Sequence, residues 1–245
     1  MHTKDRKDIP VIQVRKLHKV YTMGEEHVAA LKNISLSVHR GEICCIFGTS
    51  GSGKSTLLNQ LAGLEKPTAG EVRIGGVPIS RLDENELAAF RQKHVGFVFQ
   101  SYNLLPELTA VENVAMPLMF RGVPKEIREL EAKKMLCRVG LGNRLNHYPG
   151  QMSGGQQQRA GIARAFITRP DVVFADEPTG NLDSRTTKEV MEMIRMFARK
   201  FHQTIVLVSH DPEMTEYADR IVTLLDGEII SDVYTENTES TGERL

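Results

Sequence analysis

The sequence predicts an α/β protein with a mostly parallel central sheet, an antiparallel β-subdomain near the N-terminus and an inserted helical subdomain. Three observations indicate this architecture. A glycine-rich loop, GTSGSGKST (48–56), lies between an apolar strand-like run and a helix-like run. Short apolar runs that end in polar residues occur before and after residues 101–150. Those intervening residues instead carry helix-start signals, which favours a separate helical block.

The N-terminal part has the pattern of β-structure. Residues 10–47 contain β-prone runs at 11–14 and 34–38, with turn signals at Gly24 and at 39–41. We therefore expect antiparallel strands over 10–47, followed by a hairpin over 70–79. Tyr21 ends the first run, and its spacing fits either a sheet residue or a ligand contact.

The glycine-rich loop predicts phosphate binding. Gly48, Gly53, Lys54 and Ser55 fit the G-x-x-x-x-G-K-[ST] spacing, after a buried strand at 42–47 and before a helix at 57–62. Glycines let backbone N–H groups turn toward a phosphate, and the helix start adds its positive dipole end. Lys54 supplies a full charge, and the Ser55 hydroxyl suits Mg²⁺. A Gly/Ser-rich turn is the alternative, but the context favours a P-loop NTPase core that binds a nucleoside triphosphate.

The middle of the chain carries several helix signals. Asp83 is a candidate N-cap for a helix through Phe90, and an apolar strand follows at 95–99. Within 101–150, Thr109 and Glu112 form a capping box, and Pro124 begins a helix to about Val139. We interpret this block as a helical lobe.

The last third returns to the α/β pattern. In order, we expect a strand at 172–175, a helix over about 185–201, a strand at 205–208, a short helix from Pro212, and a hairpin of 221–225 and 228–233. Residues 235–245 are polar and aperiodic, which is typical of a frayed tail.

Polar residues follow the predicted strands at the ends where parallel sheets bind ligands. Asp176 suits a contact to Mg²⁺ through its water shell, and Glu177 suits a group that orients or deprotonates water. His210 suits a hydrogen bond to the γ-phosphate and the water, and Gln100 suits a contact to the metal or water when the lobes close. Taken singly, an acid pair here could cap a helix and a lone histidine could be a core residue. Together, behind a phosphate loop, they favour a catalytic site.

Residues 153–156 (SGGQ) form a second candidate phosphate contact. Ser153 and Gln156 fit a capping box for a helix through Ile167. That explanation leaves Gly154 and Gly155 unexplained, since each glycine costs about 1 kcal/mol relative to alanine inside a helix. Glycines at a helix start permit close approach of a phosphate. Because one phosphate cradle is already present, we expect a nucleotide held between two copies of the chain.

Composition narrows the classes of function. The 245 residues include 31 Lys plus Arg and 31 Asp plus Glu, so bulk electrostatics gives no reason to expect nucleic acid or an anionic membrane surface. No apolar run reaches the about 20 residues of a membrane span, and residues 1–10 lack a signal-peptide core. Cys44, Cys45 and Cys137 fit buried or half-buried apolar positions of a reduced cytoplasmic protein. Cys44 and Cys45 are strand neighbours and should face opposite sides.

The motif order GTSGSGKST, Gln100, MSGGQQQR, VVFADEP, NLD (181–183) and His210 resembles the nucleotide-binding subunit of an ABC transporter, from about Val11 to Val233. The resemblance implies a single ABC ATPase domain. Its α/β core with the β-subdomain covers 9–100 and 169–234, and its helical subdomain with the signature motif covers 101–168. The tail is 235–245.

The resemblance also assigns roles. It implies that Tyr21 stacks on adenine, that Glu177 is the catalytic glutamate and that His210 is the switch histidine. Gln100 matches the lobe-coupling loop and Asp183 the loop that crosses the dimer interface. The expected ATP contacts are Gly48, Ser50, Gly51, Ser52, Gly53, Lys54, Ser55 and Thr56 from one copy, and Ser153, Gly154, Gly155 and Gln156 from the other. The expected Mg²⁺ contacts are Ser55, Gln100 and Asp176.

Finer details are similar to one subfamily, the ATPases of macrolide exporters, lipoprotein-release complexes, antimicrobial-peptide pumps and the cell-division complex. The similarity lies in the segments YTMGEEHVAAL, FVFQSYNLLPELTAVENV and DEPTGNLD. Two departures are visible: Met152 replaces the usual leucine, a volume-conserving change, and Thr49 stands where proline is common.

The resulting hypothesis is an ATP-hydrolysing homodimer at the cytoplasmic face of the inner or plasma membrane. It would drive a separate integral-membrane permease, which docks near the apolar-rich residues 101–122. Alternatively, those residues simply pack the helical lobe. The rival functions are a soluble ABC ATPase acting on DNA or ribosomes, and a kinase-like phosphotransferase, which would leave SGGQ without a role.

Overall fold

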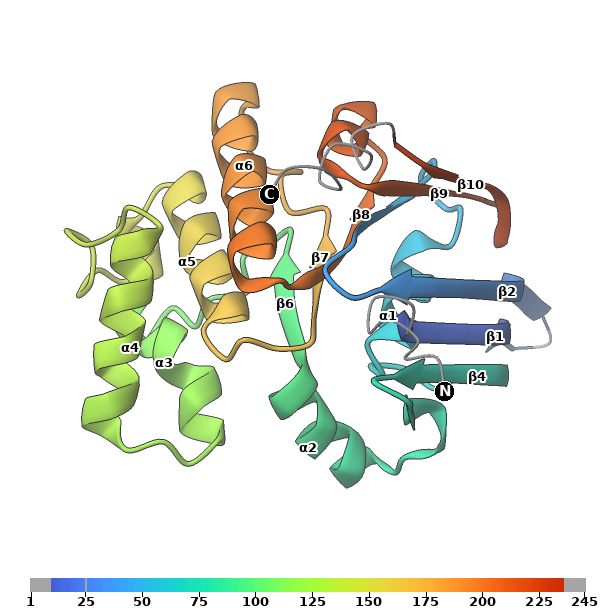
Figure 1. The fold of residues 1–245 in the computed structure, drawn as a ribbon, viewed down its shortest axis with the longest axis horizontal. Coiled ribbons are helices and arrows are strands. Elements are labelled where there is room, and N and C mark those ends of the chain that lie inside the picture. The colour runs from blue at the N-terminus through green and yellow to red at the C-terminus, as the bar shows by residue number, and fades with distance from the viewer. Residues whose placement is uncertain (1–9, 25, 236–245) are drawn as a thin grey trace, which may run out of the picture.

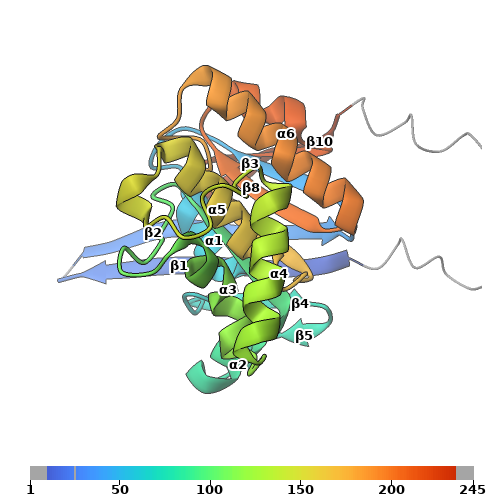
Figure 2. The same ribbon diagram turned by 90° about the vertical axis from the view of Figure 1, so that its left-hand side faces the viewer.

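The computed structural model describes residues 10–24 and 26–235, arranged as two sheets and a helical block. The helical block lies at one end of the molecule and the antiparallel sheet at the other (Figure 1). Figure 2 views the molecule from the helical end, with α4 and α5 in front. The predicted tail 235–245 lies outside the described residues except for Thr235, and so does the N-terminal segment 1–9.

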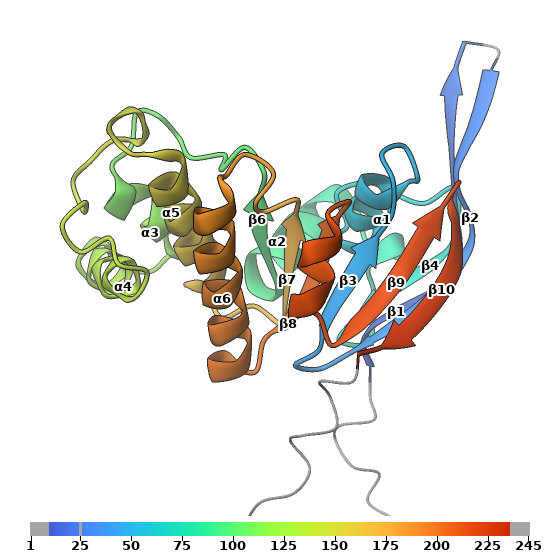
Figure 3. The same cartoon turned by 90° about the horizontal axis from the view of Figure 1, so that it is seen from above.

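The first sheet has the strand order β2-β1-β4-β5 and is antiparallel throughout. It contains β1 (Pro10–Met23), β2 (Glu26–His39), β4 (Ala69–Ile74) and β5 (Val77–Pro78). The two predicted short runs prove to be parts of 14-residue strands, and the far end of their hairpin projects from the molecule (Figure 3). Register shifts along β1, with a left-handed Lys16 (φ 46°), keep these long strands paired.

The second sheet has the order β10-β9-β3-β8-β7-β6. Its strands are β3 (Ile43–Phe47), β6 (Val95–Phe99), β7 (Val172–Asp176), β8 (Thr204–Ser209), β9 (Arg220–Leu225) and β10 (Glu228–Tyr234). Pairing is parallel from β9 through β6, and only β10 is antiparallel. The parallel core is thus confirmed, but the assignment of all of 10–47 to antiparallel structure is wrong. β3 pairs with β8 and β9, which come much later in the chain.

Helices connect these strands. α1 (Lys54–Leu61) begins three residues earlier than predicted, because Gly53 caps it in the left-handed region (φ 100°). α2 (Glu84–His94) starts at the predicted Asp83 cap, with a complete capping box, and runs past Phe90. α6 (Ser184–Phe201) agrees with the predicted span. The short helices η2 (Ile79–Arg81) and η4 (Pro212–Tyr217) are 3₁₀-helices.

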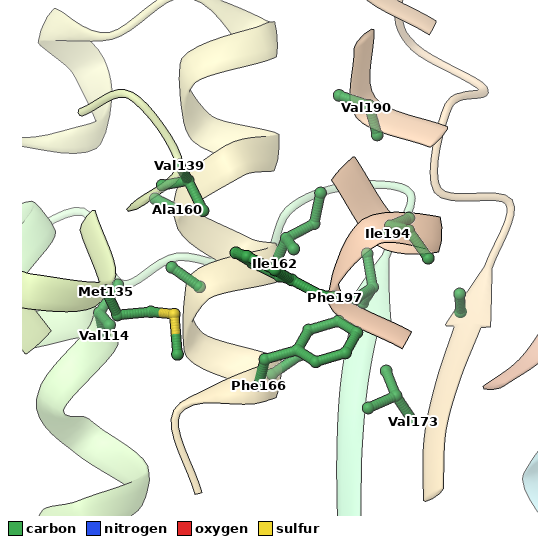
Figure 4. Close-up of a cluster of buried hydrophobic side chains, with 14 of the residues drawn as sticks. Val114, Met135, Val139, Ala160, Ile162, Phe166, Val173, Val190, Ile194 and Phe197 are labelled. Atoms are coloured by element: carbon green, nitrogen blue, oxygen red, sulfur yellow. The ribbon is translucent and has the colours of Figure 1, made fainter. Parts of the chain in front are cut away.

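The helical block contains α3 (Ala110–Phe120), α4 (Lys125–Arg138), η3 (Pro149–Gln151) and α5 (Gly154–Phe166). The predicted capping boxes at Thr109–Glu112 and Ser153–Gln156 are both present. The block shares one apolar core with the parallel sheet and α6. Phe166 of α5 points toward Phe197 of α6, with ring centroids 5.4 Å apart (Figure 4). α5 therefore joins the block to the sheet.

The cysteines follow the predicted pattern except for one. Cys44 and Cys45 are fully buried and belong to different apolar clusters on the two faces of the sheet, as strand neighbours should. Cys137 is exposed, so the expectation that it is buried or half-buried is wrong. Met135 and Leu136 take the core-facing positions of α4, which turns Cys137 outward.

Candidate functional site

The loop 48–53 connects β3 to α1, as the motif predicts. Gly51 and Gly53 have positive φ angles of 82° and 100°, which side chains disfavour. A Cβ at Gly48 would lie 2.3 Å from the Leu224 carbonyl oxygen, so the loop packs directly on β9. The loop therefore has the strand–loop–helix geometry in which backbone N–H groups can surround an anion.

An open cavity of about 820 Å³ lies over this loop. Glu177 and His210 line it from the carboxyl ends of β7 and β8. The predicted loop residues that line it are Ser50, Gly51, Gly53, Lys54, Ser55 and Thr56. Val28 and Lys32 of β2 and the turn at Asp226 and Gly227 also line it. No local signal in the sequence predicts these four residues, because tertiary packing alone brings them here.

Lys54 is almost fully buried within the loop. Its Nζ donates a hydrogen bond to the Thr49 carbonyl oxygen at 2.7 Å. The side chain thus places a full positive charge at the floor of the cavity, where backbone donors also converge. This position suits the terminal phosphates of a nucleotide.

Asp176 ends β7 beside the loop. Burial raises the pKa of its carboxyl group, the negative charge of Glu177 adds to the rise, and a hydrogen bond from the Ser55 hydroxyl opposes it. Its Oδ1 is buried without a hydrogen-bond partner. An unpartnered carboxylate oxygen next to a serine hydroxyl fits the oxygen donors that Mg²⁺ prefers. Within residues 10–24 and 26–235, no three His, Cys, Asp or Glu converge on a metal.

Glu177 and His210 form a pair at the mouth of the cavity. His210 Nδ1 lies 2.8 Å from Glu177 Oε1. Glu177 itself has a left-handed backbone (φ 42°), held by its N–H, which donates to the Val208 carbonyl oxygen at 3.0 Å. A strained backbone that fixes a carboxylate at a cavity mouth is typical of a functional position. The pair can hold and deprotonate a water molecule.

Gln100 does not line the first cavity in the single chain. It follows β6, the edge strand, which is separated from β3 by β8 and β7. Its side-chain Nε2 would lie 2.6 Å from a Cβ at Gly180. The structure therefore brings together the ends of β3, β7 and β8, and it places Gln100 beside the loop after β7.

Tyr21 lies next to the cavity. Its hydroxyl donates to Glu65 Oε2 at 2.7 Å, and Lys19 Nζ lies 5.0 Å from its ring centroid. Burial, followed by the hydrogen bond to Glu65, raises the pKa of Tyr21, while a hydrogen bond with Thr56 of the loop lowers it. The ring is thus fixed beside the loop, and its stacking on adenine stays a prediction.

A second cavity, of about 440 Å³, contains the other half of the predicted residues. Ser153, Gly154, Gly155, Gln156 and Asp183 line it, together with Arg159, Asn181, Thr186 and Glu189, which the sequence analysis missed. The two cavities have no lining residue in common. Within one chain the SGGQ segment is therefore not part of the cavity over the phosphate loop.

The glycines of this second cavity have a packing role within the chain. A Cβ at Gly154 would lie 2.8 Å from the Tyr102 hydroxyl oxygen, and one at Gly155 would lie 2.6 Å from Thr186 Cγ2. Packing within the chain is thus a second reason for these glycines, beside the predicted approach of a phosphate. Asp183 caps α6, and hydrogen bonds from the Thr186 side chain and backbone lower its pKa.

Replacing Asp176 with asparagine should stabilise the nucleotide-free protein at pH 7. Burial raises the pKa of Asp176 in the folded state above its pKa in the unfolded state. At pH values between these two pKa values, the native state therefore binds more protons than the unfolded state. The free energy of unfolding therefore falls as the pH rises through this range. Asparagine does not ionise, so the Asp176→Asn variant avoids this fall. We expect a Tm higher by about 2 °C at pH 7 and no gain below pH 4.

Thermal unfolding at the two pH values measures this effect. Asp83→Asn is the matched control, because it keeps the exposed cap of α2 and should leave the Tm unchanged at both pH values. A Tm for Asp176→Asn equal to or below that of the wild type at pH 7 would contradict the assigned burial cost.

Comparison with known proteins places this geometry in context. The family model described as "ABC transporter" matches residues 31–180. The chain is 50% identical to an ABC transporter ATP-binding protein of Methanocaldococcus jannaschii, over 90% of this chain and 98% of that one. It is also 47% identical to the macrolide export ATP-binding/permease protein MacB of Hahella chejuensis, over 91% of this chain but only 34% of MacB.

Solved structures agree with these matches. The ATP-binding cassette MJ0796, solved as a dimer, superposes with a TM-score of 0.85 at 43% identity, covering 91% of this chain and 98% of that one. A second structure of the same cassette is a dimer in a post-hydrolysis state bound to ADP and phosphate, with a TM-score of 0.85 at 42% identity. It covers the same share of each chain.

Proposed function

Because the chain belongs to the ABC transporter family and is an ATPase of that family, we propose that it is the motor subunit of an export-type or mechanically acting transporter. Two copies would close over two ATP molecules, with the phosphate loop of each facing residues 153–156 of the other. The observation that carries this proposal is the separation of the site into two open cavities without shared lining residues. A head-to-tail pair would join them.

The predicted site residues have distinct chemical roles in this proposal. Lys54 and the loop amides bind the β- and γ-phosphates. Mg²⁺, held by Ser55, Asp176 and Gln100, would neutralise charge on the phosphate oxygens. Glu177 accepts a proton from the attacking water as the bond to the γ-phosphorus forms and ADP leaves. His210 holds the Glu177 carboxylate in position, Tyr21 packs on the adenine, and Asp183 lies at the dimer interface.

The proposed membrane partner would dock on part of residues 101–122. Ala110, Val111 and Val114 are buried in the helical block, whereas Leu105, Met119 and Phe120 are exposed. Packing of the lobe therefore accounts for only some of this apolar segment. Within residues 10–24 and 26–235, no helix is long and apolar enough to cross a bilayer.

The relatives differ in length. The chain covers 98% of the archaeal ATP-binding protein, whereas MacB, whose name includes a permease, is about three times as long as the matched part. We propose that the ATPase lies at the cytoplasmic face of the membrane, held there by this permease. The transported substrate would be determined by that partner.

Phe120→Glu tests the docking surface. Phe120 is 57% exposed on the helical block, and a charge there should abolish recovery of a multi-span protein from detergent-solubilised membranes. Met196→Glu, at a 49% exposed methionine of α6, is the matched control and should retain recovery. Recovery of ribosomes or DNA with the wild type would instead support the soluble ABC ATPase.

Gly155→Ala separates the packing role of the SGGQ glycines from a role in ATP binding. The added Cβ would meet Thr186 Cγ2, so this variant should be destabilised by about 1–3 kcal/mol. Adding Thr186→Ser removes that methyl group but keeps the hydroxyl that donates to Asp183 Oδ2, so stability should return. If the ATP bound by the partner copy approaches Gly155, the added Cβ would obstruct it. The Gly155→Ala/Thr186→Ser variant should then be stable but fail to dimerise with ATP.

Size-exclusion chromatography with ATP, in the Glu177→Gln background, measures this dimerisation. Thr186→Ser alone should dimerise as the parent does. Normal dimer formation by the double variant would show that Gly155 serves intramolecular packing only, and it would remove the support that this glycine gives to the shared site.

A further inference from the structure

The loop that follows Gln100 is held in an unusual conformation. Tyr102 and Asn103 are consecutive non-glycine residues with positive φ angles of 61° and 47°. Such conformations are costly and persist only where surrounding contacts fix them. Contacts to this loop come from α5 and from the loop after β7.

Arg164, in the last turn of α5, supplies the first set of contacts. Its Nη2 donates to the Tyr102 carbonyl oxygen at 2.9 Å, and its Nη1 donates to that of Asn103. The planar guanidinium matches two adjacent carbonyl groups, which the single ammonium of a lysine cannot do. Burial lowers the pKa of Arg164.

Tyr102 itself lies along α5. Its carbonyl oxygen is 3.6 Å from the position of a Cβ at Gly161, and its hydroxyl oxygen is 2.8 Å from that at Gly154. Gly154 and Gly161 are seven residues apart and therefore lie on the same face of α5. Because neither has a side chain, Tyr102 can lie close against the helix there. The loop thus contacts α5 at both its last turn and its SGGQ start.

The second contact comes from the catalytic core. Asn181 Nδ2 donates to the Gln100 carbonyl oxygen at 3.0 Å. The main chain at Gln100 is therefore bound to the loop after β7, while Tyr102 and Asn103 are bound to α5. A displacement of α5 relative to the sheet would act directly on Gln100.

We propose that Arg164 is a positioning residue for Gln100. Arg164 fixes loop 100–103 to α5, so that Gln100 and the SGGQ segment move together. This inference rests on the proposed function, in which Gln100 contacts the nucleotide-bound metal. Arg164 touches neither nucleotide nor metal in that arrangement. It acts through the main chain of Tyr102 and Asn103.

Arg164→Lys tests the proposal, with Arg121→Lys as a matched control. Arg121 also donates its guanidinium to backbone carbonyl oxygens, those of Gln92 (2.7 Å), Lys93 (2.9 Å) and Thr168 (3.0 Å), and burial also lowers its pKa. These bonds do not involve loop 100–103. Both variants should lose a similar amount of thermal stability.

The expected difference lies in catalysis and in hydrogen exchange. Arg164→Lys should lower kcat for ATP about tenfold, with the Kd for ATP within twofold of the wild type. Its amides at Tyr102 and Asn103, which donate to the carbonyl oxygens of Phe99 and Ser101, should exchange about tenfold faster. Arg121→Lys should match the wild type in both measurements.

Three outcomes would overturn the proposal: equal losses of kcat in the two variants, an unchanged kcat with a loosened loop, or a lower kcat with unchanged exchange. If Arg164→Lys does not fold, Asn181→Ala replaces it. Asn181 is exposed, and its removal should free the Gln100 main chain, accelerate exchange in the loop and lower kcat about threefold. If it leaves both unchanged, the loop is not held as proposed.

Failure of the proposed function gives a different result. A wild-type chain that hydrolyses no ATP would remove the motor role. The exchange comparison of Arg164→Lys with Arg121→Lys needs no turnover, so it would still show whether Arg164 fixes the loop.

Discussion

Replacing Glu177 with glutamine should reduce ATP turnover by about 10²–10⁴-fold while ATP stays bound. Glutamine is nearly isosteric, so its side-chain oxygen can still accept from His210, whose Nδ1 lies 2.8 Å from Glu177 Oε1. The change removes the basicity needed to take a proton from water, but it leaves the phosphate-binding groups unchanged. The trapped nucleotide should therefore hold two copies together.

Two measurements check this expectation, steady-state ATP hydrolysis and size-exclusion chromatography with ATP. The variant should elute as a stable dimer. Glu213→Gln, at an exposed carboxylate of η4, is the control and should hydrolyse ATP at the wild-type rate. Normal turnover in Glu177→Gln would remove Glu177 from its role. A nucleotide-loaded variant that remained a single protomer at high concentration would contradict the shared site.

Lys54→Ala should weaken ATP binding itself, by about 10–100-fold. Lys54 is only 6% exposed, and its ammonium group lies at the floor of the cavity, where its charge is poorly screened by water. Alanine removes that charge and leaves the phosphates with backbone donors only. Titration with a fluorescent ATP analogue measures the change in Kd.

Lys32→Ala provides the comparison within the same cavity. Lys32 lines it from β2, but its side chain is 45% exposed, so its removal should change the Kd by no more than about threefold. An unchanged affinity in Lys54→Ala would contradict the loop assignment. Equal losses in both variants would show that the cavity attracts anions only through its overall charge.

Local signals predicted much of this structure. The phosphate loop, the capping boxes of α3 and α5 and the strand that ends at Asp176 depend on residues within a few positions of one another. The grouping of β3 was wrong because its partners β8 and β9 are distant in sequence. The residues of a short apolar strand do not indicate which other strands it pairs with.

The candidate site likewise contains residues that local motifs predicted and residues that only tertiary packing brings there. Lys54, Glu177 and His210 were predicted to share a site and do line one cavity. Val28 and Asp226 could not be predicted, because only the packing of the first sheet and the C-terminal hairpin against the loop brings them there. Similarly, the packing reason for Gly155 is visible only once α6 places Thr186 beside it.

The turn between β9 and β10 determines when the phosphate loop can take shape during synthesis. The Gly227 N–H donates to the Ser52 carbonyl oxygen at 3.0 Å, and the Lys32 N–H donates to that of Gly227 at 2.8 Å. The anion cradle therefore depends on residues that leave the ribosomal tunnel long after the loop itself. We expect nascent chains that end before Asp226 to capture no ATP, and stalled chains of increasing length would locate this step.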